Sequence, residues 1–232
     1  MQKKLMAELT RLYLPTGASA STQPLNLASA DGGTRALVII FDRQPGADET
    51  QHWSSLCLVA NALQTQLDLP APAVSISGSH GYRLWLSFDA AMPVAVVGQF
   101  LALLRMAYFP ELPEQADVAG ATVAFPPYQE MTTGLWAAFI NPGLGASFAE
   151  ESGLDMAPPM AGQLALLDGL SGISETQFAH AMTLLEHAHG PVPAATVAAA
   201  PGGLLLKDAT LEDIVKHLHS LHIEPTFRHL IK

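Results

Sequence analysis

Apolar residues recur along this chain with two different spacings, and the two spacings alternate. Apolar positions three or four residues apart are typical of one face of a helix, whereas continuous or every-second apolar positions are typical of strands. The pattern predicts helices over residues 3–14, 56–67, 93–107 and 174–189. It predicts strands over residues 36–42, 73–77, 83–88, 121–125 and 135–140. Residues 16–34 are mostly small or polar and are expected to form a loop.

The centre of the predicted fold is a hairpin over residues 75–88. Its two strands flank a Gly-Ser-His-Gly connection, after which Leu84, Leu86 and Phe88 occupy every second position. This alternation predicts a strand that buries one face. The run 36–42 is instead continuously apolar, which is typical of a central strand covered on both faces.

The predicted order is strand, helix, strand, strand, helix, strand. That order is typical of RRM-like and ferredoxin-like domains, in which helices cover one face of an antiparallel sheet. We therefore expect an α+β fold with a βαββαβ core over residues 35–190, extended by additional strands and helices. Residues 1–34 are expected to add a helix and a loop. The Ala, Pro and Gly residues of 191–203 predict a linker, and 204–232 predict a small helical C-terminal appendage.

Composition limits the partners of the chain. Hydrophobic residues make up 49% of it and charged residues 14%, which predicts a globular core. Eleven Lys and Arg residues against 21 Asp and Glu residues give a formal net charge of −10. Nucleic-acid binders usually carry a basic face, so this balance disfavours an autonomous DNA or RNA binder. We expect a protein partner, which would supply positive charge if nucleic acid is bound at all.

Other features concern the cellular compartment. The single cysteine, Cys57, lies in an apolar run and is expected to be a buried, inert thiol. No apolar run approaches the roughly twenty residues of a membrane span. The first residues lack the pattern of a secretory signal. These observations predict a cytoplasmic protein without membrane contact.

Several short motifs follow one another in a characteristic order. A strand ending in Asp42 is followed by a helix, by SGSHGYRLWLSF at 77–88, by an apolar helix, by FPPYQ at 125–129 and by INPGLG at 140–145. Over about residues 36–190 this succession resembles the catalytic core of archaeo-eukaryotic primases. The variety it resembles is the small primase-polymerase domain associated with bacterial mobile elements and conflict systems.

The resemblance implies a metal site that has lost a ligand. In that family the strand that matches residues 37–42 ends in two acidic residues separated by one, and these bind divalent metal ions. Side chains at positions i and i+2 of a strand face the same side, as joint ligation requires. Here the matching positions are Ile40 and Asp42. A single carboxylate holds Mg²⁺ poorly, because that ion needs several oxygen ligands.

The resemblance also implies altered nucleotide contacts. The family hairpin carries a histidine that contacts the nucleotide phosphates, and Arg83 stands at the matching position. Arginine can hold phosphate as a fixed cation, but it cannot shuttle a proton. Further nucleotide-binding candidates are Ser77, Ser79, His80 and Asn141, the last standing near the place of a family lysine.

Two of these positions have a simpler explanation as well. An Asp that ends a strand, like Asp42, is often a turn former. Arg83 is equally well explained as a structural residue on the outward side of its strand. Both explanations stay open at the level of sequence.

Three hypotheses about function follow. The first is a catalytically degenerate primase-like protein that acts as a structural or regulatory subunit, binds a partner protein in a DNA replication, repair or defence complex, and needs no cofactor. The second is an active primase or polymerase, a nucleotidyltransferase that uses Mg²⁺ or Mn²⁺ held by Asp42 together with Glu150, Glu151 or Asp155. The third is a nucleic-acid-binding module without catalysis.

Overall fold

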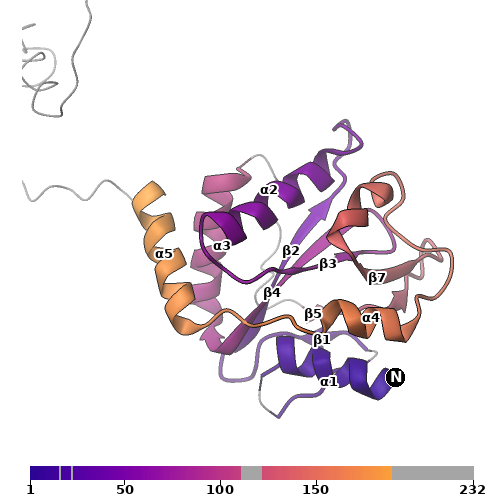
Figure 1. Ribbon diagram of the computed structural model, residues 1–232, viewed down its shortest axis with the longest axis horizontal. Helices are drawn as coiled ribbons and strands as arrows, with labels where there is room; N and C mark the ends of the chain where they lie inside the picture. Colours follow the sequence, from indigo (N-terminus) through magenta and orange to yellow (C-terminus); the bar gives the residue numbers. More distant parts are fainter. Residues whose placement is uncertain (16, 22, 111–121, 190–232) are drawn as a thin grey trace, which may run out of the picture. The chain divides into compact units, whose positions relative to one another are not determined.

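The computed structural model describes residues 1–189 except 16, 22 and 111–121 (Figure 1). Its helices are α1 (Gln2–Tyr13), α2 (Gln51–Thr65), α3 (Val94–Tyr108), α4 (Met160–Leu167) and α5 (Glu175–His189), together with the 3-10 helix η1 (Pro142–Phe148). Its strands are β1 (Leu25–Asn26), β2 (Gly33–Asp42), β3 (Ala73–Ile76), β4 (Gly81–Pro93), β5 (Thr122–Val123), β6 (Tyr128–Gln129) and β7 (Trp136–Ile140). The protein is therefore of the mixed α+β class. The predicted linker and appendage lie outside the described residues.

The strands form two antiparallel sheets. The larger has the order β2-β4-β3-β7-β6, and the smaller pairs β1 with β5. The strand expected at 121–125 is therefore present as β5, but it pairs with β1 outside the larger sheet. Because β1 lies within residues 16–34, the prediction of an uninterrupted loop there was wrong.

The predicted hairpin is confirmed. Strands β3 and β4 pair in antiparallel register, and the backbone N–H of Ser77 donates to the carbonyl of Gly81 over 2.9 Å. A Cβ atom at Gly81 would overlap the carbonyl oxygen of Phe41 on β2, so only glycine fits there. This glycine lets β2 and β4 approach closely where Asp42 ends its strand.

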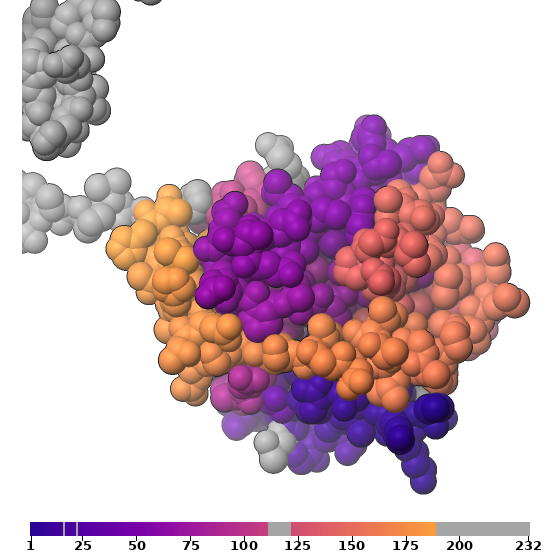
Figure 2. Space-filling view, viewed as in Figure 1, coloured from indigo at the N-terminus to yellow at the C-terminus, as the bar shows by residue number. Residues whose placement is uncertain are grey.

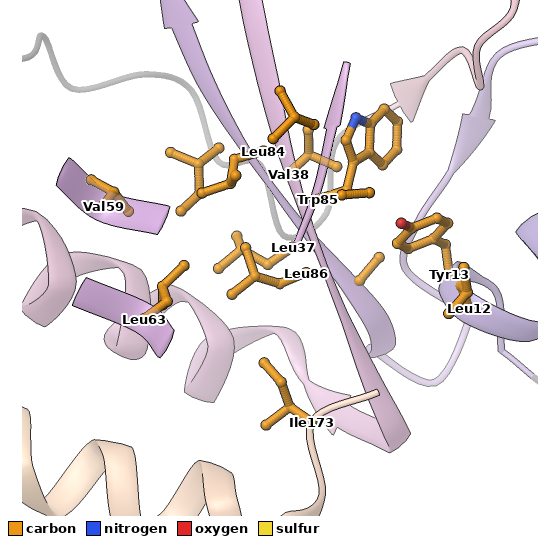
Figure 3. Packing of buried hydrophobic residues seen from close by; sticks show 14 of the residues in the cluster. Leu12, Tyr13, Leu37, Val38, Val59, Leu63, Leu84, Trp85, Leu86 and Ile173 are labelled. Atoms are coloured by element: carbon orange, nitrogen blue, oxygen red, sulfur yellow. The ribbon is translucent and has the colours of Figure 1, made fainter. Parts of the chain in front are cut away.

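Helices cover both faces of the larger sheet. Leu37 and Leu86 point toward Val59 of α2, whereas Trp85 lies on the side of Tyr13 of α1 (Figure 3). The ring centroids of Tyr13 and Trp85 are 5.4 Å apart. The prediction of helices on one face was therefore wrong, since α2 and α3 cover one face and α1 packs on the other.

The position of β2 also differs from the prediction. Its residues Leu37, Val38, Ile39 and Phe41 are buried, as a continuously apolar run predicts. Among the described strands, however, β2 stands at one end of the larger sheet and β4 lies inside it. The continuous apolar run of β2 is therefore explained by the helices that cover both of its faces, and not by a central position in the sheet.

Two segments after β7 were not predicted as helices. The expected loop at 141–145 overlaps η1, which begins at Pro142, and α4 follows it. The amide side chain of Gln163 on α4 accepts from the Phe139 N–H over 2.8 Å and donates to the Phe139 carbonyl over 2.9 Å. Strand β6 pairs only with Trp136 and Ala137 of β7. Gln163 thus provides hydrogen-bond partners for the backbone N–H and C=O groups of Phe139 farther along β7.

The last described helix begins as its sequence predicts. The Ser174 hydroxyl accepts from the Gln177 N–H, and the Gln177 side chain accepts from the Ser174 N–H, which is a capping box. Helix α5 packs beside α3, where the ring of Phe178 lies 5.2 Å from that of Phe100. Figure 2 shows α5, in orange, on the same face of the molecule as α2, in purple.

None of the helices in the described part of the chain is long and apolar enough to cross a membrane. Cys57 of α2 is partly exposed, so the prediction of full burial was wrong. Its partial burial raises the pKa of the thiol, which disfavours the reactive thiolate.

Candidate functional site

A cavity of about 220 Å³ opens on the face of the larger sheet that lies opposite α2 and α3. Strands β2, β3 and β4 form its floor, and the segment from β5 to β6 forms its rim. Its lining residues are Val38, Ile40, Ser75, Ile76, Ser77, Arg83, Trp85, Thr122, Val123, Ala124, Pro126 and Tyr128. Most of these side chains are apolar, and Arg83 is the charged one.

The structure brings Ile40, Asp42 and Arg83 together. Ile40 and Arg83 are direct partners across β2 and β4, and Asp42 follows two residues after Ile40 on the same strand face. The Arg83 Nη1 atom donates to the Asp42 Oδ1 atom over 2.5 Å. The same nitrogen donates to the carbonyl of Tyr82 over 2.9 Å.

This ion pair joins the two residues whose roles the sequence left open. The side chain of Arg83 is 22% exposed and that of Asp42 is 37% exposed, so water reaches both. Each charge is compensated by the other, and Arg83 also lines the cavity. Arg83 is thus a strand residue with an ion pair and, at the same time, the charged residue among those that line the cavity.

Tyr128 is a cavity residue that the sequence did not single out. It was part of the motif at 125–129, but no role was assigned to its side chain. Burial raises the pKa of the Tyr128 hydroxyl, the Arg83 guanidinium opposes that rise, and Glu130 and Asp42 add to it. The hydroxyl is therefore protonated at neutral pH and can donate a hydrogen bond.

The serines of the hairpin turn serve the turn itself. The Ser77 Oγ atom accepts from the backbone N–H groups of Ser79 and Gly81, over 3.2 Å and 3.1 Å. The two serine hydroxyls lie 3.2 Å apart. Ser77 is buried at the cavity floor, whereas Ser79 is not among the lining residues. The two side chains hold the connection between β3 and β4 in shape.

Two other candidates lie away from the cavity. His80 is exposed at the tip of the turn, where its carbonyl accepts from the Arg43 N–H over 2.8 Å. Asn141 is exposed, and its Oδ1 atom accepts from the Gly143 N–H over 2.9 Å, which caps η1. Neither residue lines the cavity beside Arg83.

The carboxylates present fit a pair of divalent metal ions poorly. Asp42 is bound by Arg83, and Ile40 offers no oxygen. Glu150, Glu151 and Asp155 are exposed. In the described part of the chain, no three or more His, Cys, Asp or Glu side chains form a group that could hold a metal ion. Mg²⁺ and Mn²⁺ prefer several oxygen ligands, which this donor set does not provide.

His52 of α2 is a second residue that sequence spacing did not reveal. It is 3% exposed, and neither ring nitrogen has a hydrogen-bond partner. Its ring lies 5.1 Å from that of Tyr82, whose hydroxyl donates to the Gly145 carbonyl over 2.7 Å. Burial lowers the pKa of His52, Arg43 lowers it further, and Asp42 opposes both. The ring is therefore held in its neutral form beside the strand that ends in Asp42.

A comparison of the sequence with protein-family models found no match, and a comparison with curated proteins found none either.

Proposed function

We propose that the chain is a primase-like protein that has lost nucleotidyl transfer and acts as a structural or regulatory subunit. In this role it binds a partner protein in a DNA replication, repair or defence complex. The order β2, α2, β3, β4, α3 supports an RRM-like primase core, and so does the position of β4 between β2 and β3. The proposal combines this topology with the resemblance of residues 36–190.

The contact between Arg83 and Asp42 carries the proposal. At the place where an active relative holds metal ions with two carboxylates, this chain has one carboxylate, and Arg83 neutralises it. Ile40 puts an apolar side chain at the position of the other carboxylate. A triphosphate brought here would meet one cation that is already paired, and no second acidic side chain to share a metal ion.

The charge of the whole chain supports a protein partner. At −10, the chain repels the phosphate backbone of DNA or RNA unless another molecule supplies positive charge. A basic partner protein would provide that charge and would also be attracted to this chain.

Template-directed nucleotide incorporation tests the loss of catalysis. The full chain is assayed on a primed and on an unprimed template with all four dNTPs, in Mg²⁺ and separately in Mn²⁺. We expect incorporation equal to that of a reaction without protein. An Ile40→Asp variant, which restores carboxylates at i and i+2, is tested in parallel to learn whether the second carboxylate alone is limiting.

Incorporation by the natural sequence that disappears in Asp42→Ala would refute the proposal and favour an active polymerase. Asp168→Ala, which removes an exposed carboxylate outside the candidate metal ligands, is the matched control and should leave such incorporation unchanged. A contaminating polymerase would be unaffected by either change. Gel-shift titration with single-stranded DNA at low salt tests the remaining alternative. Binding there would favour a nucleic-acid-binding module.

A further inference from the structure

The cavity beside Arg83 has a charge balance that determines which ligands it can accept. Arg83 contributes one positive charge at its wall, and Asp42 contributes one negative charge to the same ion pair. The other walls include Val38, Ile40 and Trp85, which are apolar or aromatic. The site as a whole is therefore electrically neutral.

A neutral site of this kind disfavours anions. An anionic group that reached Arg83 would be attracted by the guanidinium and repelled by Asp42, so the two contributions largely cancel. It would also lose its hydration among apolar walls without full compensation. An uncharged group avoids both penalties.

The side chains of Arg83 and Tyr128 offer hydrogen-bond donors to such a group. The bonds of Arg83 to Asp42 and to the Tyr82 carbonyl both use its Nη1 atom, which leaves Nε and Nη2 without a partner among the described residues. The Tyr128 hydroxyl likewise has no hydrogen-bond partner in the described ranges, although Tyr128 lines the cavity. Both groups donate, so the complementary ligand presents an acceptor such as a carbonyl oxygen.

The size of the cavity restricts the ligand further. Its volume of about 220 Å³ is below the range of roughly 300–1,000 Å³ that is typical of sites for drug-sized ligands. A compact apolar body with one amide or carbonyl group suits that space. A nucleoside triphosphate exceeds it and adds several negative charges.

We propose that this cavity binds a small uncharged ligand with an apolar body and a carbonyl acceptor, which hydrogen-bonds to Arg83 and Tyr128. The ligand class is that of a primary or secondary amide with a branched aliphatic group. The inference shares one premise with the proposed function, because both require that Ile40 and the ion pair exclude triphosphates.

A pair of ligands that differ in one charge provides the test. The ¹⁵N-labelled full chain is titrated with N-acetyl-leucinamide, with N-acetyl-leucine as its carboxylate, and with dATP plus Mg²⁺, while amide signals are followed by NMR. We expect saturable shifts at Val38, Ile40 and Tyr128 with the amide. The carboxylate is expected to bind at least tenfold more weakly, and dATP is expected to leave these signals unchanged.

Two variants check the origin of the preference. Asp42→Asn removes the balancing charge, so the carboxylate should then bind more tightly than the amide, while Asp155→Asn, which removes an exposed charge, should keep the original order. Ile40→Phe reduces the space and should weaken both ligands.

The inference is overturned if the carboxylate or dATP binds this cavity at least as tightly as the amide. Absence of saturable shifts with all three ligands overturns it as well. These outcomes are distinct from nucleotide incorporation, which alone would refute the proposed loss of catalysis.

Discussion

The two faces of the larger sheet differ in the side chains that they carry. Toward α2 and α3 the strands present Leu37, Leu84 and Leu86, which are all buried among apolar neighbours. On the opposite face, Trp85 donates through its Nε1 atom to Ser75 Oγ over 2.8 Å, and Arg83 pairs with Asp42. The first face, here called the packed face, lies under α2 and α3, whereas the second borders the cavity beside Arg83 with internally paired polar groups.

We therefore expect one face to contribute mainly to stability and the other mainly to ligand binding. Burial of apolar side chains against α2 supplies free energy of folding in proportion to the area removed from water. The other face also buries Trp85 and Phe139, and in addition it offers hydrogen-bond donors next to an empty space. Substitutions on the two faces should therefore affect different properties.

The largest expected effect comes from the packed face. Leu84→Ala removes a side chain with 0% exposure, and we expect the free energy of unfolding to fall by roughly 2–5 kcal/mol. Urea denaturation followed by circular dichroism measures the change. Ile40→Ala, on the neighbouring strand but at the cavity, is the matched control and should cost less than half as much. Equal losses would contradict the division between the faces.

A smaller effect is expected from the buried hydrogen bond on the cavity face. Ser75→Ala leaves the indole N–H of Trp85 buried without an acceptor, which should reduce the free energy of unfolding by about 1–3 kcal/mol. In the double variant with Trp85→Phe the cost of losing the Ser75 hydroxyl should be much lower, because no donor is left unpaired. Additive losses in this double-mutant cycle would show that the bond contributes nothing.

The smallest expected effect concerns His52, a polar group of α2 on the packed face. Burial holds the pKa of His52 below its ordinary value of 6.5, and Arg43 acts in the same direction, while Asp42 opposes them. The unfolded chain therefore takes up the proton at higher pH than the folded chain does. The contribution of His52 to the free energy of unfolding should therefore be constant above about pH 6.5 and should fall as the pH decreases below that value.

Denaturation curves at several pH values measure this fall. His52→Phe should remove its contribution and should not lower stability at neutral pH, since an unpartnered polar ring is replaced by an apolar one. Leu58→Phe introduces the same side chain at an exposed, uncharged position of α2 and should leave the pH dependence of stability as it was. A pH profile unchanged by His52→Phe would show that this ring is not responsible.

The local elements of the fold were largely predictable. The Leu stripe of residues 3–14 predicted α1, and the Ser174 to Gln177 capping box predicted the start of α5, because each depends on neighbours within one or two turns. Helix α4 was missed, although it is the source of Gln163. Its sequence is apolar except for Gln163 and lacks the amphipathic spacing that marks a helix.

The site was predictable only in part. Positions 40 and 42 share a face because strand side chains alternate, so the sequence already places the apolar Ile40 beside Asp42. Tyr128 and His52 carried no such signal, since their importance depends on what surrounds them. The contact between Arg83 and Asp42 joins residues 41 positions apart, and spacing along the chain says nothing about it.

The positions of most helices and strands, the hairpin at 75–88 and the placement of Ile40 and Asp42 on one strand face follow from the sequence alone. The tertiary structure decided that α1 covers the second face, that β5 pairs with β1, and that Arg83 neutralises Asp42 beside a cavity. The reason is physical: capping and side-chain alternation act between near neighbours, whereas strand order and register arise from contacts between distant segments.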